Sequence, residues 1–225
     1  HDEERRRYWK MAELGLELLQ LTSGKFKAVN RLQTAIEQYT ESDFKIDQLQ
    51  RRFERQAIEV VEENSALTDL KELIRNQYSQ FVEKSQKQFQ ELVQKEHWPV
   101  EGMLYNTQVF AKKVQPLLKA KSKTAYILVD ALRFELAKEL GENIEKNFTI
   151  QLTPSCAYLP TVTKFGMAAL LPEADKKLSL RECKGNLEAF IGEKPLLSLT
   201  HRREYLKEQL GTLCEIVTLN SISLS

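Results

Sequence analysis

The sequence predicts an α/β protein in two parts: a helical N-terminal region, followed by a domain in which helices alternate with strands of a mostly parallel sheet. Residues 3–118 are rich in Glu, Gln, Lys, Arg and Leu, which favour helices. Apolar residues recur there every three or four positions. After Lys123, short apolar segments alternate with helical ones, as in βαβ units. We therefore expect a helical region at 1–119 and an α/β domain at 120–225.

The overall composition restricts the function only broadly. The chain has 225 residues with 33 basic and 32 acidic side chains, and its net charge of +1 gives no general attraction to nucleic acid or membranes. No apolar run approaches the roughly 20 residues that cross a bilayer, and the polar start is unlike a signal peptide. We expect a cytoplasmic protein. The three cysteines match no zinc or redox motif, so we expect buried thiols and no disulfide (Cys156, Cys183 and Cys214).

Three helices are predicted before residue 65. The first carries apolar residues at helical spacing and ends at Ser23 and Gly24 (Tyr8, Met11, Leu14, Leu18 and Leu21). The second covers Phe26 to about Thr40. The third begins near Ser42, where a Ser or Asp side chain can cap the free amides, and ends at Asn64.

A long helix is predicted from Leu67 to Glu96, because its apolar residues repeat every three, four or eight positions. It ends before Pro99, because proline disfavours the helical conformation in the residue that precedes it. A short helix follows from Met103 to Leu118. We expect these helices to pack as an antiparallel array. An extended rod is the alternative, although the apolar positions keep no strict heptad.

In the second part, strands are predicted at 125–129, 148–152 and 214–219, and helices at 133–146, 163–171 and 205–210, with a helical turn at 188–191. Gly211 is a favourable helix C-cap. Strands separated by helices predict a largely parallel sheet with both faces covered.

Asp130 follows the first predicted strand, at the end where ligands collect in open parallel sheets. It is either a metal ligand or the N-cap of the next helix, and spacing alone does not separate these readings. Thr161 and Thr163 lie at the start of a later helix whose residues 166–169 are small or flexible enough to allow close packing on the sheet. A threonine there can attack phosphorus when a cation assists, or it can merely cap the helix.

The strings VDALRFELAKEL (129–140) and LPTVTKFGMAALLP (159–172) resemble the PglZ domain of bacterial phage-defence systems of the BREX type. PglZ domains resemble the alkaline phosphatase superfamily, whose nucleotide pyrophosphatase and phosphodiesterase branch has Asp-Gly-hydrophobic-Arg after a strand and Pro-Thr-x-Thr before a helix. The matching segments here are residues 130–133 and 160–163. The resemblance covers roughly residues 121–211 and implies the front portion of an alkaline-phosphatase-like α/β/α domain.

The resemblance implies that Asp130 binds a divalent metal, zinc in a two-metal site, and that Thr163 is both a metal ligand and the nucleophile. Arg133 would contact the substrate phosphate, or pair with a neighbouring carboxylate. Structural roles are expected for Glu135 and Lys164. The implied reaction is hydrolysis of a phosphomonoester or phosphodiester, with a nucleotide or nucleic acid among the possible substrates.

The chain departs from the superfamily pattern after Thr163. The further metal ligands of these enzymes are aspartates and histidines, and His201 is the only histidine beyond Thr163. We expect His201 to be solvent-exposed, the chain to be the front part of a larger protein, and this part to be inactive alone. Two functions remain: a phosphohydrolase, or a phosphatase-like scaffold that binds other defence proteins. Direct nucleic-acid binding ranks last, because no basic surface is concentrated in the sequence.

Overall fold

The computed structural model of the chain describes residues 2–24, 26–60 and 65–217. It forms two compact units: residues 1–100 with 133–152, and residues 101–132 with 153–225. No helix within the described residues is both long enough and apolar enough to cross a membrane. Each unit has its own buried core.

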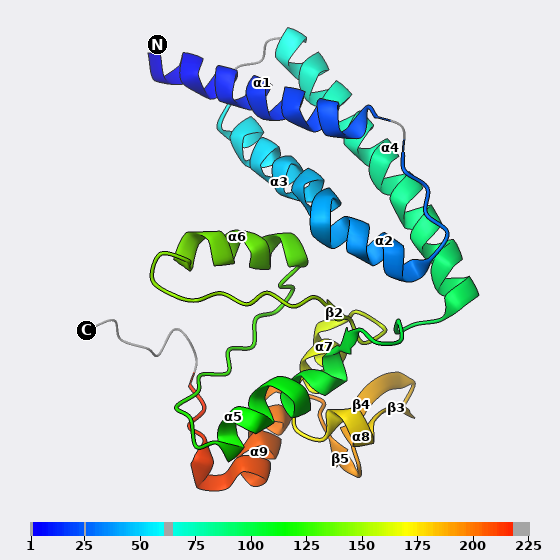
Figure 1. Cartoon of the computed structure of the whole chain (residues 1–225), viewed down its shortest axis with the longest axis vertical. Coiled ribbons are helices and arrows are strands. Elements are labelled where there is room, and N and C mark those ends of the chain that lie inside the picture. The colour runs from blue at the N-terminus through cyan, green and yellow to red at the C-terminus, as the bar shows by residue number, and fades with distance from the viewer. Residues whose placement is uncertain (1, 25, 61–64, 218–225) are drawn as a thin grey trace. The chain divides into compact units, whose positions relative to one another are not determined.

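The first unit is built on three helices, α1 (Asp2–Thr22), α3 (Phe44–Glu59) and α4 (Ser65–Glu96), which lie side by side (Figure 1). Their apolar faces enclose one core (Met11, Leu14, Leu18, Ile46, Phe53, Ala57, Val60 and Ile74). Gln77 of α4 donates to the carbonyl of Thr22, and Arg75 of α4 donates twice to Glu54 of α3. The first and fourth predicted helices are therefore confirmed, and they pack together as expected.

The second predicted helix is wrong at its start and at its end. Helix α2 (Leu32–Gln38) begins six residues later than Phe26, and it continues through the π-helical turn η1 (Tyr39–Asp43) into α3 without a break. The reason is visible at Ser42, whose hydroxyl donates to the carbonyl of Gln38 inside the helix and caps no amide. The predicted end of the third helix at Asn64 lies outside the described residues.

Helix α6 (Phe134–Ile144) confirms the helix predicted at 133–146 and packs on α3 within the first unit. The ring of Phe134 meets those of Phe44 and Tyr39 edge to face. Arg51 of α3 pairs with Glu139 of α6. Residues 148–152, which follow α6, are extended but belong to no strand. Phe148, at 63% exposure, stands with the exposed Ile150 and Leu152 at alternate positions.

The second unit packs α7 (Thr163–Ala169), α8 (Ala174–Lys177) and α9 (Leu199–Leu210) around a small antiparallel sheet (Figure 1). That sheet contains β3 (Leu178–Cys183), β4 (Asn186–Ile191) and β5 (Lys194–Pro195). The helical turn expected at 188–191 is therefore wrong, because Lys184 and Gly185 close a two-residue hairpin at positive φ. Helix α9 begins six residues before the prediction, where Ser198 caps the amide of His201, and it ends at Gly211 as expected.

A second, parallel pair joins β1 (Leu104–Tyr105) to β2 (Ser155–Cys156). The helix predicted at 103–118 is instead β1 followed by three helical segments, η2 (Asn106–Gln108), η3 (Phe110–Val114) and α5 (Gln115–Lys119). A last 3₁₀ turn, η4, covers Gly211–Leu213. The α/β class is confirmed, with a helical N-terminal region and a small parallel sheet.

Two of the strands predicted in this unit are absent. Residues 125–129 are extended but unpaired, and residues 214–217 form no strand, while 218 and 219 lie outside the described residues. Tyr126 anchors the first segment by donating to the carbonyl of Leu170 and by packing on Phe110. The opposite face of the segment is open, with Ile127 at 62% exposure. The parallel order predicted for the whole sheet therefore holds only for β1 and β2.

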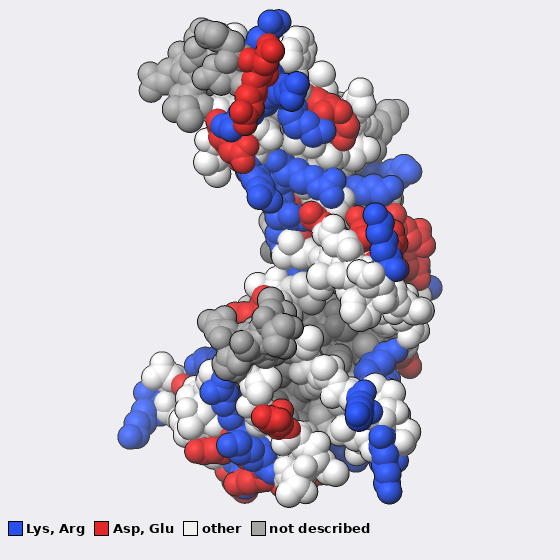
Figure 2. Space-filling view, turned by 90° about the vertical axis from the view of Figure 1, so that its left-hand side faces the viewer, with Lys and Arg blue, Asp and Glu red and all other residues white. Residues whose placement is uncertain are grey.

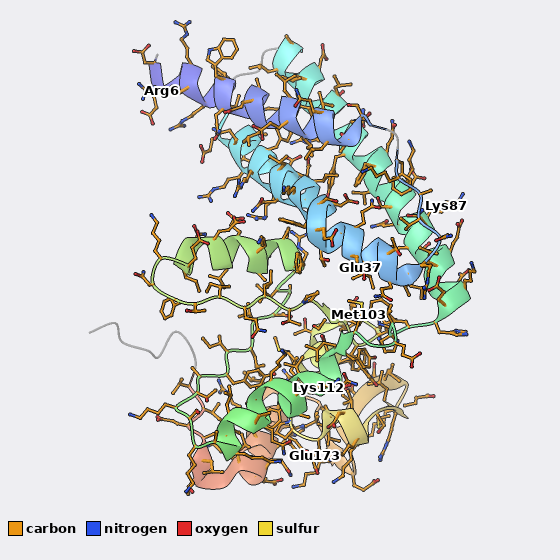
Figure 3. The ribbon with its side chains drawn as sticks, viewed as in Figure 1. Arg6, Glu37, Lys87, Met103, Lys112 and Glu173 are labelled. Carbon is orange, nitrogen blue, oxygen red and sulfur yellow. The ribbon has the colours of Figure 1, made fainter. Side chains whose placement is uncertain are left out.

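Charged side chains of both signs are interspersed on the face seen in Figure 2. Arg6, Glu37 and Lys87 of the first unit project from its helices into solvent (Figure 3).

Of the three cysteines, Cys156 is buried, while Cys183 and Cys214 are partly exposed.

Candidate active site

The structure brings together the two residues on which the sequence hypothesis depends. The hydroxyl of Thr163 donates to Oδ2 of Asp130 at 3.2 Å. Asp130 ends the extended segment that Tyr126 fixes in place, and Thr163 is the first residue of α7. Both side chains are exposed. A carboxylate and a hydroxyl 33 positions apart thus face the same solvent-accessible point.

The backbone beside Asp130 is strained. Ala131 has φ of 51°, a left-handed conformation that costs an alanine about 1–2 kcal/mol and a glycine almost nothing. A glycine at this position would adopt the same conformation without that cost. Such conformations often occur at functional sites, where a turn must aim a neighbouring side chain. Here the turn follows the carboxylate directly.

Helix α7 holds Thr163 through its buried side. Phe165, Ala168 and Ala169 are buried, and Phe165 and Ala168 belong to the core of the second unit. The small residues at 168 and 169 therefore allow close packing, as expected. Gly166 does not contribute, because a Cβ at that position would meet nothing within 4 Å.

The basic residues near the two motifs are held by carboxylates. Lys164 pairs with Glu188 of β4 at 3.3 Å and donates to the carbonyl of Leu187. Arg133 belongs to the first unit, where its Nη2 lies 2.6 Å from Oε1 of Glu135.

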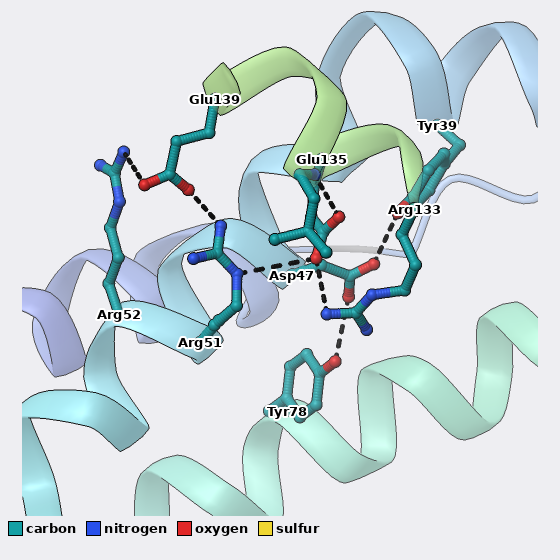
Figure 4. A network of polar contacts seen from close by, with 9 residues as sticks. Tyr39, Asp47, Arg51, Arg52, Tyr78, Arg133, Glu135 and Glu139 are labelled. Atoms are coloured by element: carbon teal, nitrogen blue, oxygen red, sulfur yellow. Dashed lines mark hydrogen bonds and ion pairs between the residues drawn. The ribbon is translucent and has the colours of Figure 1, made fainter. Parts of the chain in front are cut away.

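Glu135 is 0% exposed and lies at the centre of the ion-pair network in Figure 4. Its Oε1 also faces Nε of Arg51 at 3.7 Å, while Arg51 pairs with Glu139. Those contacts are ionic, and neither Oε1 of Glu135 nor Nε of Arg51 has a well-aligned hydrogen bond. Glu135 thus connects the start of α6 to α3 through its contact with Arg51.

Arg202 of α9 is a site residue that sequence reasoning missed. Burial lowers the pKa of its guanidinium, and the charge of Asp130 acts in the opposite direction. A partly buried cation therefore lies within electrostatic reach of the candidate metal ligand. No local sequence signal could have found it, because only the folding of α9 onto the second unit brings it there.

His201, which precedes Arg202, was expected to be solvent-exposed, and that expectation is wrong. The side chain is partly buried, and its Nδ1 is buried without a hydrogen-bond partner. Ser198 sets this orientation by capping the backbone amide of His201 at the start of α9.

The donor atoms present suit a divalent cation only in part. Asp130 and Thr163 offer a carboxylate and a hydroxyl oxygen 3.2 Å apart, which hard and borderline cations accept. Within the described residues, no group of three or more His, Cys, Asp or Glu side chains could hold a metal ion. These two residues would therefore supply part of a coordination shell.

Comparison with known proteins gives a family match that includes Asp130 and Thr163. Residues 109–219 match the BREX system PglZ alkaline phosphatase-like domain. The chain is 31% identical over 117 residues to the alkaline phosphatase-like protein PglZ of Bacillus cereus, covering 51% of this chain and 13% of that protein. It is 33% identical over 144 residues to the alkaline phosphatase-like protein BrxZ of Escherichia coli O9:H4, covering 60% of this chain and 17% of the relative. No solved structure matches.

Proposed function

We propose that the chain is part of a metal-dependent phosphohydrolase acting in phage defence, because its residues 109–219 match the PglZ alkaline phosphatase-like domain of BREX systems. We propose Thr163 as the nucleophile, Asp130 and Thr163 as metal ligands, and the cytoplasm as the place of action beside other BREX proteins. One observation carries the proposal: the hydroxyl of Thr163 lies against the carboxylate of Asp130 at 3.2 Å.

In the proposed reaction, Thr163 Oγ1 loses its proton to solvent and forms a bond to phosphorus while the bond from phosphorus to the leaving oxygen breaks. The leaving alkoxide takes a proton from water and departs as the alcohol. Asp130 accepts the hydrogen bond of that hydroxyl and so orients it toward the substrate. Water then releases phosphate from Thr163 and restores the hydroxyl. A divalent metal, zinc by family resemblance, would offset the charge of the phosphoryl oxygens.

Arg133 is proposed as a contact to the substrate phosphate. Its side chain is 57% exposed even while it pairs with Glu135, so part of the guanidinium remains accessible to solvent. A planar guanidinium can bind phosphate through two parallel hydrogen bonds. Glu135 would then limit the directions from which a phosphate can be bound.

The proposal is tested by phosphate release from an aryl phosphate and an aryl phosphodiester with Zn²⁺ or Mn²⁺, using the protein expressed from its natural gene. We expect Thr163→Ala and Asp130→Ala each to lower kcat at least about a thousandfold, because the nucleophile or its orienting carboxylate is lost. Thr161→Ala is the matched control, an exposed threonine of the same turn that should retain activity. Full activity of Thr163→Ala would remove the nucleophile assignment.

A scaffold function is the second candidate. It is favoured by the ion pairs that engage Lys164 and Arg133, because a paired cation is less free to bind a phosphate. A wild-type protein that binds other BREX proteins, yet releases no phosphate with any divalent metal tried, would support it.

A further inference from the structure

The first unit contains a cavity of about 660 Å³ that the proposed phosphohydrolase chemistry does not use. It lies between the segment leading into α2, the turn η1 and the middle of α4. Its volume is within the range of roughly 300–1,000 Å³ that is usual for small-molecule sites. We call it the acidic cavity, because Asp43 and Asp47 line it.

Most of the cavity wall is apolar. Phe26 and Phe81 meet edge to face with centroids 6.0 Å apart, and Val82 and Phe89 continue the same wall along α4. Ile36 of α2 lines the opposite side. Such a surface favours an apolar ligand body, because removing it from water stabilises the complex.

The polar end comes from the π-helical turn. Tyr39, Asp43 and Asp47 line the cavity at intervals of four residues, so they share one face of η1 and the start of α3. A π-turn within an α-helix often marks a functional site, since its extra residue shifts side chains from their regular positions. Here it presents two carboxylates to an apolar space.

Both carboxylates have neutral hydrogen-bond partners. Asp47 accepts hydrogen bonds from the hydroxyls of Tyr39 at 2.7 Å and Tyr78 at 3.0 Å (Figure 4). Asp43 accepts a hydrogen bond from the side-chain amide of Gln38 at 2.8 Å. Neutral donors orient a carboxylate without cancelling its charge. Neutral donors therefore hold both carboxylates beside the cavity.

Cations do not balance this charge at the cavity surface. No Lys, Arg or His is among the described residues that line it. The charge of Arg133 reaches the hydroxyls of Tyr39 and Tyr78, but Arg133 is itself paired with Glu135. A ligand cation at the cavity surface would be attracted by the two aspartates, whereas a phosphate or carboxylate would be repelled.

We propose that the acidic cavity binds an organic cation with an apolar body. The cationic group lies against Asp43 and Asp47, where the ring of Tyr39 adds a cation–π contact, and the apolar body lies among Phe26, Phe81 and Val82. The ligand class is thus an amine of small-molecule size, opposite in charge to the substrate of the proposed phosphohydrolase.

Calorimetry and amide NMR of the whole chain test this with three probes of one shape: 4-phenylbutylammonium, 4-phenylbutanol and 4-phenylbutanoate. We expect the ammonium to bind at least about tenfold more tightly than the alcohol, with shifts at residues 26–47 and 81–90, and the carboxylate not to bind. Equal binding of all three probes, or shifts confined to other residues, would overturn the proposal.

Asp43→Asn and Asp47→Asn should each weaken ammonium binding about tenfold while leaving the alcohol unchanged. Glu41→Gln is the matched control: it removes one charge from an exposed position of the same turn, outside the cavity wall, and should have no effect. Because Asp47→Asn also alters the tyrosine contacts, Asp43→Asn and the cavity-filling Val82→Trp decide the outcome if that variant folds poorly. Wild-type affinity in both would refute the site.

Discussion

Ala131 shows at the scale of one residue how the site is built. Its left-handed φ turns the chain directly after Asp130, and this conformation is strained for an alanine. The two sequence motifs predicted that Asp130 and Thr163 lie close together, and their side chains form a hydrogen bond. The conformation of Ala131, the burial of His201 and the nearness of Arg202 to Asp130 were not predictable, because they depend on contacts distant in sequence.

Replacing Ala131 with glycine should therefore stabilise the protein. We expect Ala131→Gly to raise the free energy of unfolding by about 0.5–1 kcal/mol, since relief of left-handed strain exceeds the added entropy of the unfolded chain. Urea denaturation followed by circular dichroism measures the change. Ala120→Gly is the control, because φ of −77° gives no strain to relieve, and it should lower stability. A loss of stability in both variants would contradict the strain argument.

At the scale of elements, helices were easier to predict than strands. The periodicity of α1 and α4 is a local property. The predicted interruption at Ser23 therefore lies next to the observed end of α1 at Thr22, and the predicted range 67–96 lies close to the observed Ser65–Glu96. A strand is defined by its partner, and residues 125–129 and 148–152 have strand-like composition without a partner in the structure. The hairpin of β3 and β4 did carry a signal, the Lys184–Gly185 pair between alternating residues, which was overlooked.

Close packing of α1 on α4 gives a prediction at the same scale. A Cβ on Gly15 would lie 2.2 Å from Cδ1 of the fully buried Ile74. We expect Gly15→Ala to lower the free energy of unfolding by about 1 kcal/mol, because overpacking outweighs the gain in helix propensity. In an Ile74→Val background, which lacks that Cδ1 atom, the same change should be neutral or stabilising. Denaturant melts of the four proteins measure this coupling.

The control for this cycle is Gly166→Ala in α7. A Cβ there meets nothing within 4 Å, so helix propensity acts alone and stability should rise by about 0.5–1 kcal/mol. If Gly15→Ala behaved like Gly166→Ala, the close approach of α1 and α4 would be wrong.

Over the whole molecule, ionisable groups limit stability to a range of pH. Hydrogen bonds from Arg75 hold the pKa of Glu54 below its ordinary value, so this stabilisation is present above about pH 4.3 and is lost as pH falls through the lower folded pKa. Burial raises the pKa of Tyr205 to about 12. Its stabilisation is present below about pH 10, the unfolded value, and is lost as pH rises toward 12.

We therefore expect the urea midpoint to be flat from about pH 5 to pH 9.5 and to fall on both sides. Glu54→Gln should flatten the acid limb, and Tyr205→Phe should flatten part of the alkaline limb after losing its hydrogen bond to the carbonyl of Pro172. Midpoints measured at half-unit steps of pH test both. An acid limb unchanged by Glu54→Gln would assign acid unfolding to other carboxylates.

The extended segment at 125–129 presents exposed apolar side chains, and its main-chain amides and carbonyls form no ladder with any strand among the described residues. Unprotected edges of this kind recruit further β-segments, including identical ones from neighbouring molecules. Concentrated solutions of this chain should therefore form oligomers and cross-β aggregates from that edge, and a single lysine at Ile127 should act as a gatekeeper that keeps the molecules apart.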